Sequence, residues 1–409
     1  MFGELGLKPF EEGRFTRPLR QALKGRFFHE MPFSDFVGNP EVVRRLREML
    51  ARDHFPQAVI LAGAKGSGKY TLALMLARAM NCLERPAAEA PGLLAMTEGT
   101  ASDGLPDFCG HCSNCTRIGL ALDLDARFAE AVETRENLRE TDKKETRILV
   151  QTHPDLLVVP PDPPQMMIKV DQVRHVIQRI YYRPAEARES VYIFTSSAFM
   201  KEAANSLLKV LEEPPEFATI FLLTENPGEL LPTIRSRSAM FTLGAMAADE
   251  LESRLAKLRT DWNPRQRGLV ARLSEGAMGR ALSFDLEGYV AARSHALVVL
   301  KSALGGSDHS ELFKTTETYR PGAEGREKIE RLLRTFYLLL EDLMCLRSGT
   351  PQLVRNTDIL GELKKLSEAA DFAWVQRAAE GLGEVERGMR RNLLRSLSLD
   401  AFATALEAR

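Results

Sequence analysis

Short apolar runs alternate with amphipathic helical patterns over the first 243 residues of the chain. Four runs are apolar almost throughout and predict buried strands, at residues 58–63, 155–159, 190–194 and 218–224. Apolar positions at helical spacing lie between them, most clearly over residues 170–182 and 199–213. Strands that alternate with helices favour a parallel sheet covered on both faces, which places this region in the α/β class.

After residue 243 the strand-like runs stop and the pattern is helical to the end of the chain. We therefore predict an N-terminal extension at 1–30, an α/β domain at 31–243, and two helical pieces at 244–286 and 287–409. The first helix of the α/β domain is expected to follow Asn39, which can cap it, with Pro40 at its first position.

Two insertions interrupt the α/β pattern. Residues 83–108 are rich in Pro, Ala and Gly and predict a loop. Residues 121–147 are dense in both charge signs, with Leu124, Phe128 and Val132 four residues apart. This spacing predicts a solvated helix with one docking face.

The overall charge is nearly balanced, with 55 basic and 56 acidic side chains in 409 residues. This balance argues against a protein that is a basic nucleic-acid clamp over its whole surface. No uninterrupted apolar stretch reaches the roughly 18 residues of a membrane span, and the N-terminus lacks the apolar core of a signal peptide. We predict a cytoplasmic protein without a membrane partner.

A candidate phosphate-binding loop follows the first predicted strand and reads GAKGSGKYT. Its candidate nucleotide-binding residues are Gly63, Gly66, Ser67, Gly68, Lys69, Tyr70 and Thr71. Glycines let backbone N–H groups converge on phosphate oxygens at a helix N-terminus, and the lysine reaches the terminal phosphates. However, Tyr70 stands where the motif has the Ser or Thr that holds Mg²⁺.

The acidic partners of such a loop are also missing from the sequence. NTPases of this kind carry an Asp at the end of a neighbouring strand to hold Mg²⁺. The strand at 190–194 is followed instead by Thr195 and Ser196. Because neither side chain supplies a negative charge for the metal, we predict a phosphate cradle without hydrolysis.

Four of the five cysteines form a candidate metal site: Cys82, Cys109, Cys112 and Cys115. Four thiolates, three of them spaced C-x-x-C-x-x-C, suit a closed tetrahedral Zn²⁺ site of the structural kind. An iron–sulfur cluster or a redox pair is the alternative, and His111 is a possible substitute ligand. Cys345 lies in an apolar helical pattern and is expected to be a core residue.

Several of these motifs together resemble the clamp-loader branch of the AAA+ family, which includes the delta-prime and gamma/tau subunits of bacterial DNA polymerase III. The resemblance runs over residues 33–285 and is carried by FSDFVGNPEVVRRLREML, HPDLLVV, NSLLKVLEEPP and TIRSRS. It implies an α/β AAA+ P-loop domain with a parallel sheet and an inserted zinc module. A helical lid and an all-α C-terminal collar would follow.

The resemblance also assigns roles to individual residues. It implies that Arg237, in Ser236–Arg237–Ser238, is an arginine finger that acts on ATP held by a neighbouring subunit. It further implies that Thr224 and Arg280 sense phosphate. The alternatives are that Thr224 caps its strand and that Arg280 is a surface residue. With Lys69 and Arg280 in place, ATP can be bound without being cleaved.

The pattern of kept and lost motifs resembles the delta-prime class, so the implied function is that of a non-hydrolysing clamp-loader subunit in DNA replication. The implied partners are the gamma/tau and delta subunits, the sliding clamp indirectly, and primer–template DNA through the complex. One alternative is an ATP-hydrolysing gamma/tau-type motor that holds magnesium through Thr71 and Asp155. A third hypothesis is that the chain is a zinc-dependent nucleic-acid-binding module.

Overall fold

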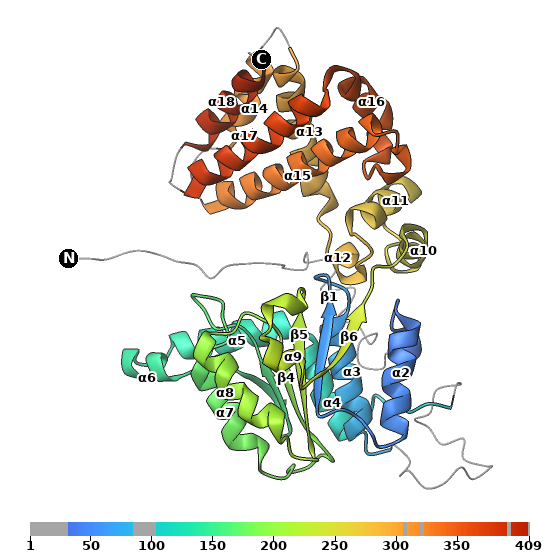
Figure 1. Ribbon diagram of the computed structural model, residues 1–409, viewed down its shortest axis with the longest axis vertical. Coiled ribbons are helices and arrows are strands. Elements are labelled where there is room, and N and C mark those ends of the chain that lie inside the picture. Colours follow the sequence, from blue (N-terminus) through green and yellow to red (C-terminus); the bar gives the residue numbers. More distant parts are fainter. Residues whose placement is uncertain (1–31, 85–103, 306–308, 320–322, 391–393, 408–409) are drawn as a thin grey trace. The chain divides into compact units, whose positions relative to one another are not determined.

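The computed structural model describes residues 32–84, 104–305, 309–319, 323–390 and 394–407, so the predicted 1–30 extension lies outside the described residues. The described chain divides into two compact units (Figure 1). Unit 1 contains the described residues up to Ala247 together with Gly276–Ser283. Unit 2 contains Ala248–Glu275 and the described residues from Phe284 on.

Unit 1 is built on a six-stranded sheet with the strand order β2-β3-β4-β5-β1-β6. The strands are β1 (Ala58–Gly63), β2 (Val150–His153), β3 (Leu156–Val159), β4 (Ser190–Phe194), β5 (Ala218–Thr224) and β6 (Ala239–Leu243). All neighbouring pairs are parallel except β2 and β3, which are antiparallel. The predicted α/β class with a parallel sheet is therefore confirmed.

Helices cover both faces of this sheet (Figure 1). One face carries α2 (Pro40–Ala51), α3 (Lys69–Asn81) and α4 (Ser113–Gly119), and the other carries α7 (Val170–Ile180), α8 (Lys201–Glu212) and α9 (Pro232–Arg235). Successive side chains of a strand point to opposite faces, so Val59 and Leu61 enter the first core while Ile60 enters the second. This double burial explains why the central strands are apolar at nearly every position.

The sheet has two strands that the sequence pattern did not predict. Both β2 and β6 lie at its edges. The four residues of β2 read VQTH, which is too short and too polar to stand out. In β6 only Phe241 and Leu243 are buried, because an edge strand is not enclosed like the central ones.

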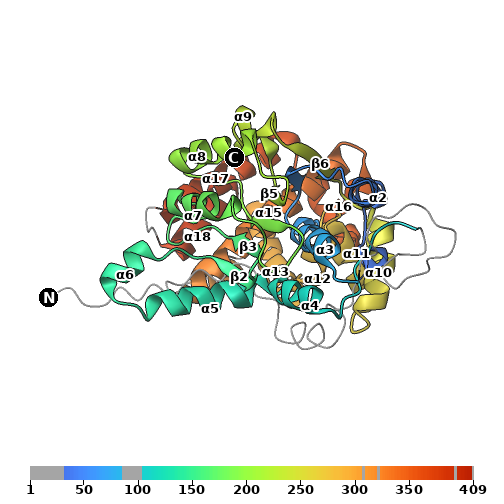
Figure 2. The same ribbon diagram turned by 90° about the horizontal axis from the view of Figure 1, so that it is seen from below.

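Two further expectations differ from the structure. The charged segment 121–147 is not one helix: a 3₁₀ turn, η2 (Leu120–Leu122), precedes α5 (Leu124–Glu136) and α6 (Glu140–Glu145). Figure 2 shows α5 beside β2 at the sheet's edge. Asn39 does not cap α2 with its side chain and lies at φ 54. Its amide instead bonds both backbone groups of Gly244, at 3.2 Å from the carbonyl and 2.7 Å from the N–H.

Unit 2 is helical in every described regular element. It contains α10 (Ala248–Leu258), α11 (Pro264–Leu273), α13 (Leu286–Ala303), α14 (Ser310–Glu317), α15 (Ala323–Arg347), α16 (Leu360–Ala369), α17 (Phe372–Arg390) and α18 (Arg395–Glu407). The apolar face of α15, including Phe336 and Leu339, is buried in the core of this unit, and Cys345 packs against it. Among the described helices, none is both long enough and apolar enough to span a membrane.

Candidate nucleotide and metal sites

The predicted phosphate loop lies between β1 and α3, at the carboxyl edge of the sheet. Gly66 and Gly68 adopt φ values of 80 and 92, a region that favours glycine. A Cβ on Gly66 would stand 2.6 Å from the backbone nitrogen of Arg280, and one on Gly68 would stand 2.9 Å from the Phe36 ring. Both glycines are therefore required by backbone shape and by close packing.

Lys69 begins α3 and folds back onto its own loop. Its ammonium donates hydrogen bonds to the carbonyl oxygens of Gly63 at 2.6 Å and Ala64 at 2.8 Å. Burial lowers the pKa of Lys69, and the Glu225 carboxylate opposes that shift. The buried hydroxyl of Ser67 makes no hydrogen bond with any described group. A partly buried cation beside an unsatisfied donor at a helix N-terminus fits a phosphate group.

Tyr70 does not replace the magnesium ligand. Its hydroxyl donates a hydrogen bond of 2.7 Å to the carbonyl of Ala121, in the turn that follows α4. Burial raises the pKa of the Tyr70 phenol, and the charge of Asp125 acts in the same direction. The phenol therefore stays neutral and tied to η2, while Thr71 is the next residue along α3.

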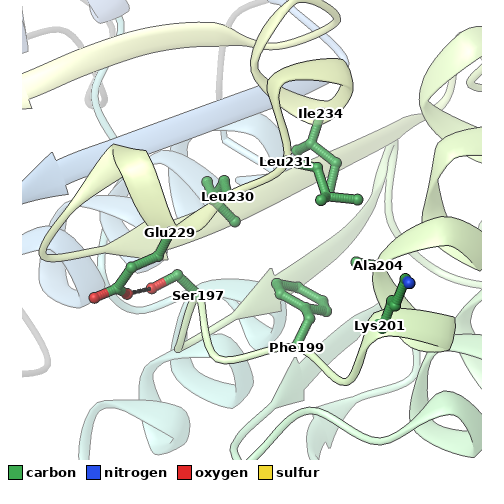
Figure 3. Close-up of a pocket in the computed structure, with 8 residues that line it drawn as sticks. All are labelled: Ser197, Phe199, Lys201, Ala204, Glu229, Leu230, Leu231 and Ile234. Atoms are coloured by element: carbon green, nitrogen blue, oxygen red, sulfur yellow. Dashed lines mark hydrogen bonds between the residues drawn. The ribbon is translucent and has the colours of Figure 1, made fainter.

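The carboxyl end of β4 carries hydroxyls where a hydrolysing site has acids. Ser197 donates a hydrogen bond of 2.5 Å to Glu229, and both residues line a cavity of about 230 Å³ (Figure 3). Phe199, Leu230 and Ile234 give this cavity an apolar lining. The carboxylate of Glu229 is thus engaged by a serine hydroxyl.

The two candidate sensors lie at the same edge of the sheet as the phosphate loop. Thr224 ends β5, where its hydroxyl donates to the carbonyl of Asn226 at 2.8 Å and accepts from the N–H of the same residue. These bonds cap the strand. Arg280 belongs to α12 (Met278–Leu282), and the N–H of Gly279 donates to the carbonyl of Gly66 at 2.8 Å. The structure thus brings Arg280 to the phosphate loop with an exposed side chain.

Arg237 lies just before β6, where the amino ends of the parallel strands meet, so it is at the other end of the strands from the phosphate loop. Because β6 runs parallel to β1 with Leu243 beside Gly63, the strand from Ala239 to Leu243 separates Arg237 from the phosphate loop, a distance of roughly 13 Å at about 3.3 Å per residue. Its guanidinium donates to the carboxylate of Glu212 at 2.9 Å and to the carbonyl of Thr233 at 3.1 Å. This pairing was not predicted, because the two motifs lie 25 residues apart with no local signal.

The four predicted metal ligands come together at the end of α3. The sulfur atoms of Cys82, Cys109, Cys112 and Cys115 all lie within 4.8 Å of one another. Backbone N–H groups donate to three of them: Cys109 to Cys82 at 3.3 Å, Cys112 to Cys109 at 3.3 Å, and Cys115 to Cys112 at 3.5 Å. Four sulfurs at this spacing fit one tetrahedral metal ion.

The thiols of this cluster change one another's pKa. A hydrogen bond from Cys115 lowers the pKa of Cys82 to about 5, and the same bond raises the pKa of Cys115. Burial raises the pKa of Cys109 to about 12. A metal ion would have to displace the protons of these thiols, so its affinity will increase with pH.

His111 is not needed as a ligand. Its side chain is exposed and pairs with Glu84, with 3.0 Å between His111 Nε2 and a carboxylate oxygen of Glu84. Its other ring nitrogen lies 2.9 Å from the carbonyl oxygen of Cys109. The histidine thus contacts the backbone of the metal loop, outside the set of four sulfurs.

Comparison with known proteins assigns the chain to a family. The family described as "DNA polymerase III, delta subunit" matches residues 38–247. The chain belongs to this clamp-loader family of AAA+ proteins. The resemblance found in the sequence is thereby confirmed.

Individual relatives are more distant. The chain is 27% identical to DNA polymerase III subunit tau of Escherichia coli over 63% of its own length and 33% of that protein. It is 24% identical to subunit delta' of Bacillus subtilis over 80% of its own length and 83% of that protein. A gamma-subunit-related protein of Thermotoga maritima aligns with a TM-score of 0.35 and 17% identity, over 89% of this chain and 99% of that one. The chain thus spans about a third of the tau subunits that it matches.

Proposed function

We propose that the chain is a non-hydrolysing, delta-prime-type subunit of a cytoplasmic DNA polymerase III clamp loader, and that it helps to place the sliding clamp on primed DNA. The observation that carries the proposal is which side chain stands at the magnesium-binding position of α3, the helix that follows the phosphate loop. Its magnesium position holds Tyr70, which is neutral and hydrogen-bonded to Ala121, while β4 is followed by Thr195 and Ser196 instead of acids. A phosphate cradle without a metal-binding side cannot neutralise the charge that develops in phosphoryl transfer.

Nucleotide binding without turnover is compatible with this arrangement. The glycine backbone, Lys69 and the Ser67 hydroxyl supply donors for phosphate oxygens. In the proposed state ATP contacts these groups without a protein-held Mg²⁺, with Arg280 nearby as a phosphate sensor. Thr224 would join it as a sensor by exchanging its bond to the carbonyl of Asn226 for one to phosphate. Zn²⁺ is the metal proposed for the four cysteines, where it ties the metal segment to the end of α3.

Arg237 is the catalytic contribution that we propose for this chain. It lies too far from its own phosphate loop to act there, and its side chain is 35% exposed. An arginine supplied in trans to the γ-phosphate of a neighbour is an established catalytic device, worth roughly 10³ or more in rate. The partners of this role are the gamma/tau and delta subunits, with primer–template DNA bound by the whole complex. Residues 244–286 would serve as the lid and 287–409 as the collar.

The second candidate function is a gamma/tau-type motor, which the similarity to tau and the intact Gly68–Lys69 pair favour. In such a motor, Thr71 and Asp155 would have to bind the magnesium ion together. Asp155 directly precedes β3, so it lies at the amino ends of the parallel strands, whereas the phosphate loop lies at their carboxyl ends. Both of its oxygens also accept backbone hydrogen bonds, from residues 185–187 at 2.7 to 2.9 Å. This geometry supports the non-hydrolysing function instead.

The test has two arms. The purified chain is assayed for steady-state ATP hydrolysis beside Lys69→Ala, and we expect the two rates to be equal. It is then combined with the ATPase subunits of its own organism, where Arg237→Ala is expected to reduce hydrolysis at the neighbouring site. Arg235→Ala is the matched control, since this exposed arginine ends α9 two residues earlier. Turnover that disappears with Lys69→Ala would assign the chain to the motor class.

A further inference from the structure

Arg78 is an unusual residue for the interior of unit 1. It lies on α3 between the phosphate loop and Cys82, and only 1% of its surface is exposed. Its guanidinium carbon stands 5.2 Å from the centre of the Phe108 ring. On another side it meets Gly119, where a Cβ would come within 1.9 Å of a guanidinium nitrogen.

The segments that enclose this guanidinium are the ones that carry the cysteines. Phe108 immediately precedes Cys109, and Gly119 ends the helix that contains Cys115. Burial lowers the pKa of Arg78, and the charge of Cys115, whose side chain is itself completely buried, opposes that shift. Arg78 lies one helical turn before Cys82 and meets the segments on either side of the other three cysteines, so it borders the metal site.

The charge of a metal-loaded site calls for such a cation. Four thiolates around one divalent ion carry a net charge of −2, and burying a charge is costly unless an opposite charge is close. Arginine keeps its proton at all relevant pH values, so the compensation is permanent. Stacking against Phe108 holds the planar group in one orientation without neutralising it.

We propose that Arg78 is the buried counter-ion of the four-cysteine site and determines how tightly that site holds its metal ion. Arg78 has no atom that could bind a metal ion, so it would act through the thiolates, as a positioning residue. Loss of such a residue typically lowers metal affinity by about 10- to 100-fold. This inference does not depend on the proposed function, because it concerns the charge of the site alone.

The experiment measures Zn²⁺ affinity of the full chain by competition with a chelator, and follows Co²⁺ binding by its thiolate charge-transfer absorption. Arg78→Met and Arg78→Gln remove the charge, whereas Arg78→Lys keeps it. The matched control is Arg47→Met. Arg47 is also buried and lies 5.2 Å from the ring of Phe33, but it bonds the carbonyls of residues 105 and 106.

We expect the neutral variants to bind Zn²⁺ about 10- to 100-fold more weakly. Arg78→Lys should stay within about threefold of the wild type, which is under 1 kcal/mol. Arg47→Met should keep its affinity even if its Tm falls. The proposal is overturned if the neutral variants bind as tightly as the wild type or lose no more affinity than Arg47→Met. It is also overturned if neither neutral variant folds without metal, because the charge would then be required by the fold itself.

Discussion

Tyr70→Phe removes one hydroxyl at the start of α3 and leaves the aromatic ring in place. That hydroxyl donates over 2.7 Å to the carbonyl of Ala121, a residue with no exposed surface. Leaving a buried carbonyl without its donor costs about 1 to 3 kcal/mol in the free energy of unfolding. For a unit of this size each kcal/mol lowers Tm by roughly 2 to 4 °C, so we expect a fall between about 2 and 12 °C.

The assay is differential scanning calorimetry of the full chain, in which unit 1 and unit 2 can unfold as separate transitions. Tyr182→Phe is the matched control, because the side chain of Tyr182 is 74% exposed and its hydroxyl is not needed in the interior. The reasoning is refuted if Tyr70→Phe and Tyr182→Phe shift the transition of unit 1 equally.

Tyr70→Thr extends the same test to chemistry. It restores the residue type that holds Mg²⁺ in a phosphate loop, but it loses the packing of the ring as well as the hydrogen bond. We expect no ATP hydrolysis above that of Lys69→Ala, because Thr195 and Ser196 still stand where the acids belong. Measurable turnover would mean that Tyr70 alone disables the site.

Three further outcomes are expected. Glu212→Gln frees the guanidinium of Arg237 from an exposed pair worth about 0.2 to 1 kcal/mol, so ATP hydrolysis by the assembled loader should rise up to about fivefold while Tm hardly changes. Removing metal with a thiol-competent chelator should lower the Tm of unit 1 in the wild type but not in Cys112→Ser. Burial alone would raise the pKa of Asp155, but three backbone N–H groups lower it overall. This carboxylate therefore stabilises the fold above its unfolded pKa of about 3.9, and Asp155→Asn should cost stability in urea at pH 7 and progressively less below about pH 4.

Much of unit 1 could be predicted from the sequence because its signals are local. The central strands are apolar at nearly every position, as double burial requires, and the phosphate loop is recognisable from its glycines and Lys69. The edge strands β2 and β6 were missed for the opposite reason: they are only partly enclosed, so their sequences carry little apolar signal. Asn39 is a residue type that often caps helices, but its side-chain amide instead hydrogen-bonds to the backbone of Gly244, 205 residues away.

By itself, the sequence determined which chemical groups are present: four cysteines at metal spacing, a phosphate loop with a tyrosine in place of a hydroxyl ligand, and an arginine in TIRSRS. Only the tertiary structure decided what surrounds them. It tied Tyr70 to Ala121, paired Arg237 with Glu212, and placed Arg78 against the cysteine segments. The pattern of apolar and polar residues within a segment reflects the burial and backbone geometry of that segment alone. Contacts between distant segments depend on how the helices pack on the sheet, which no local spacing encodes.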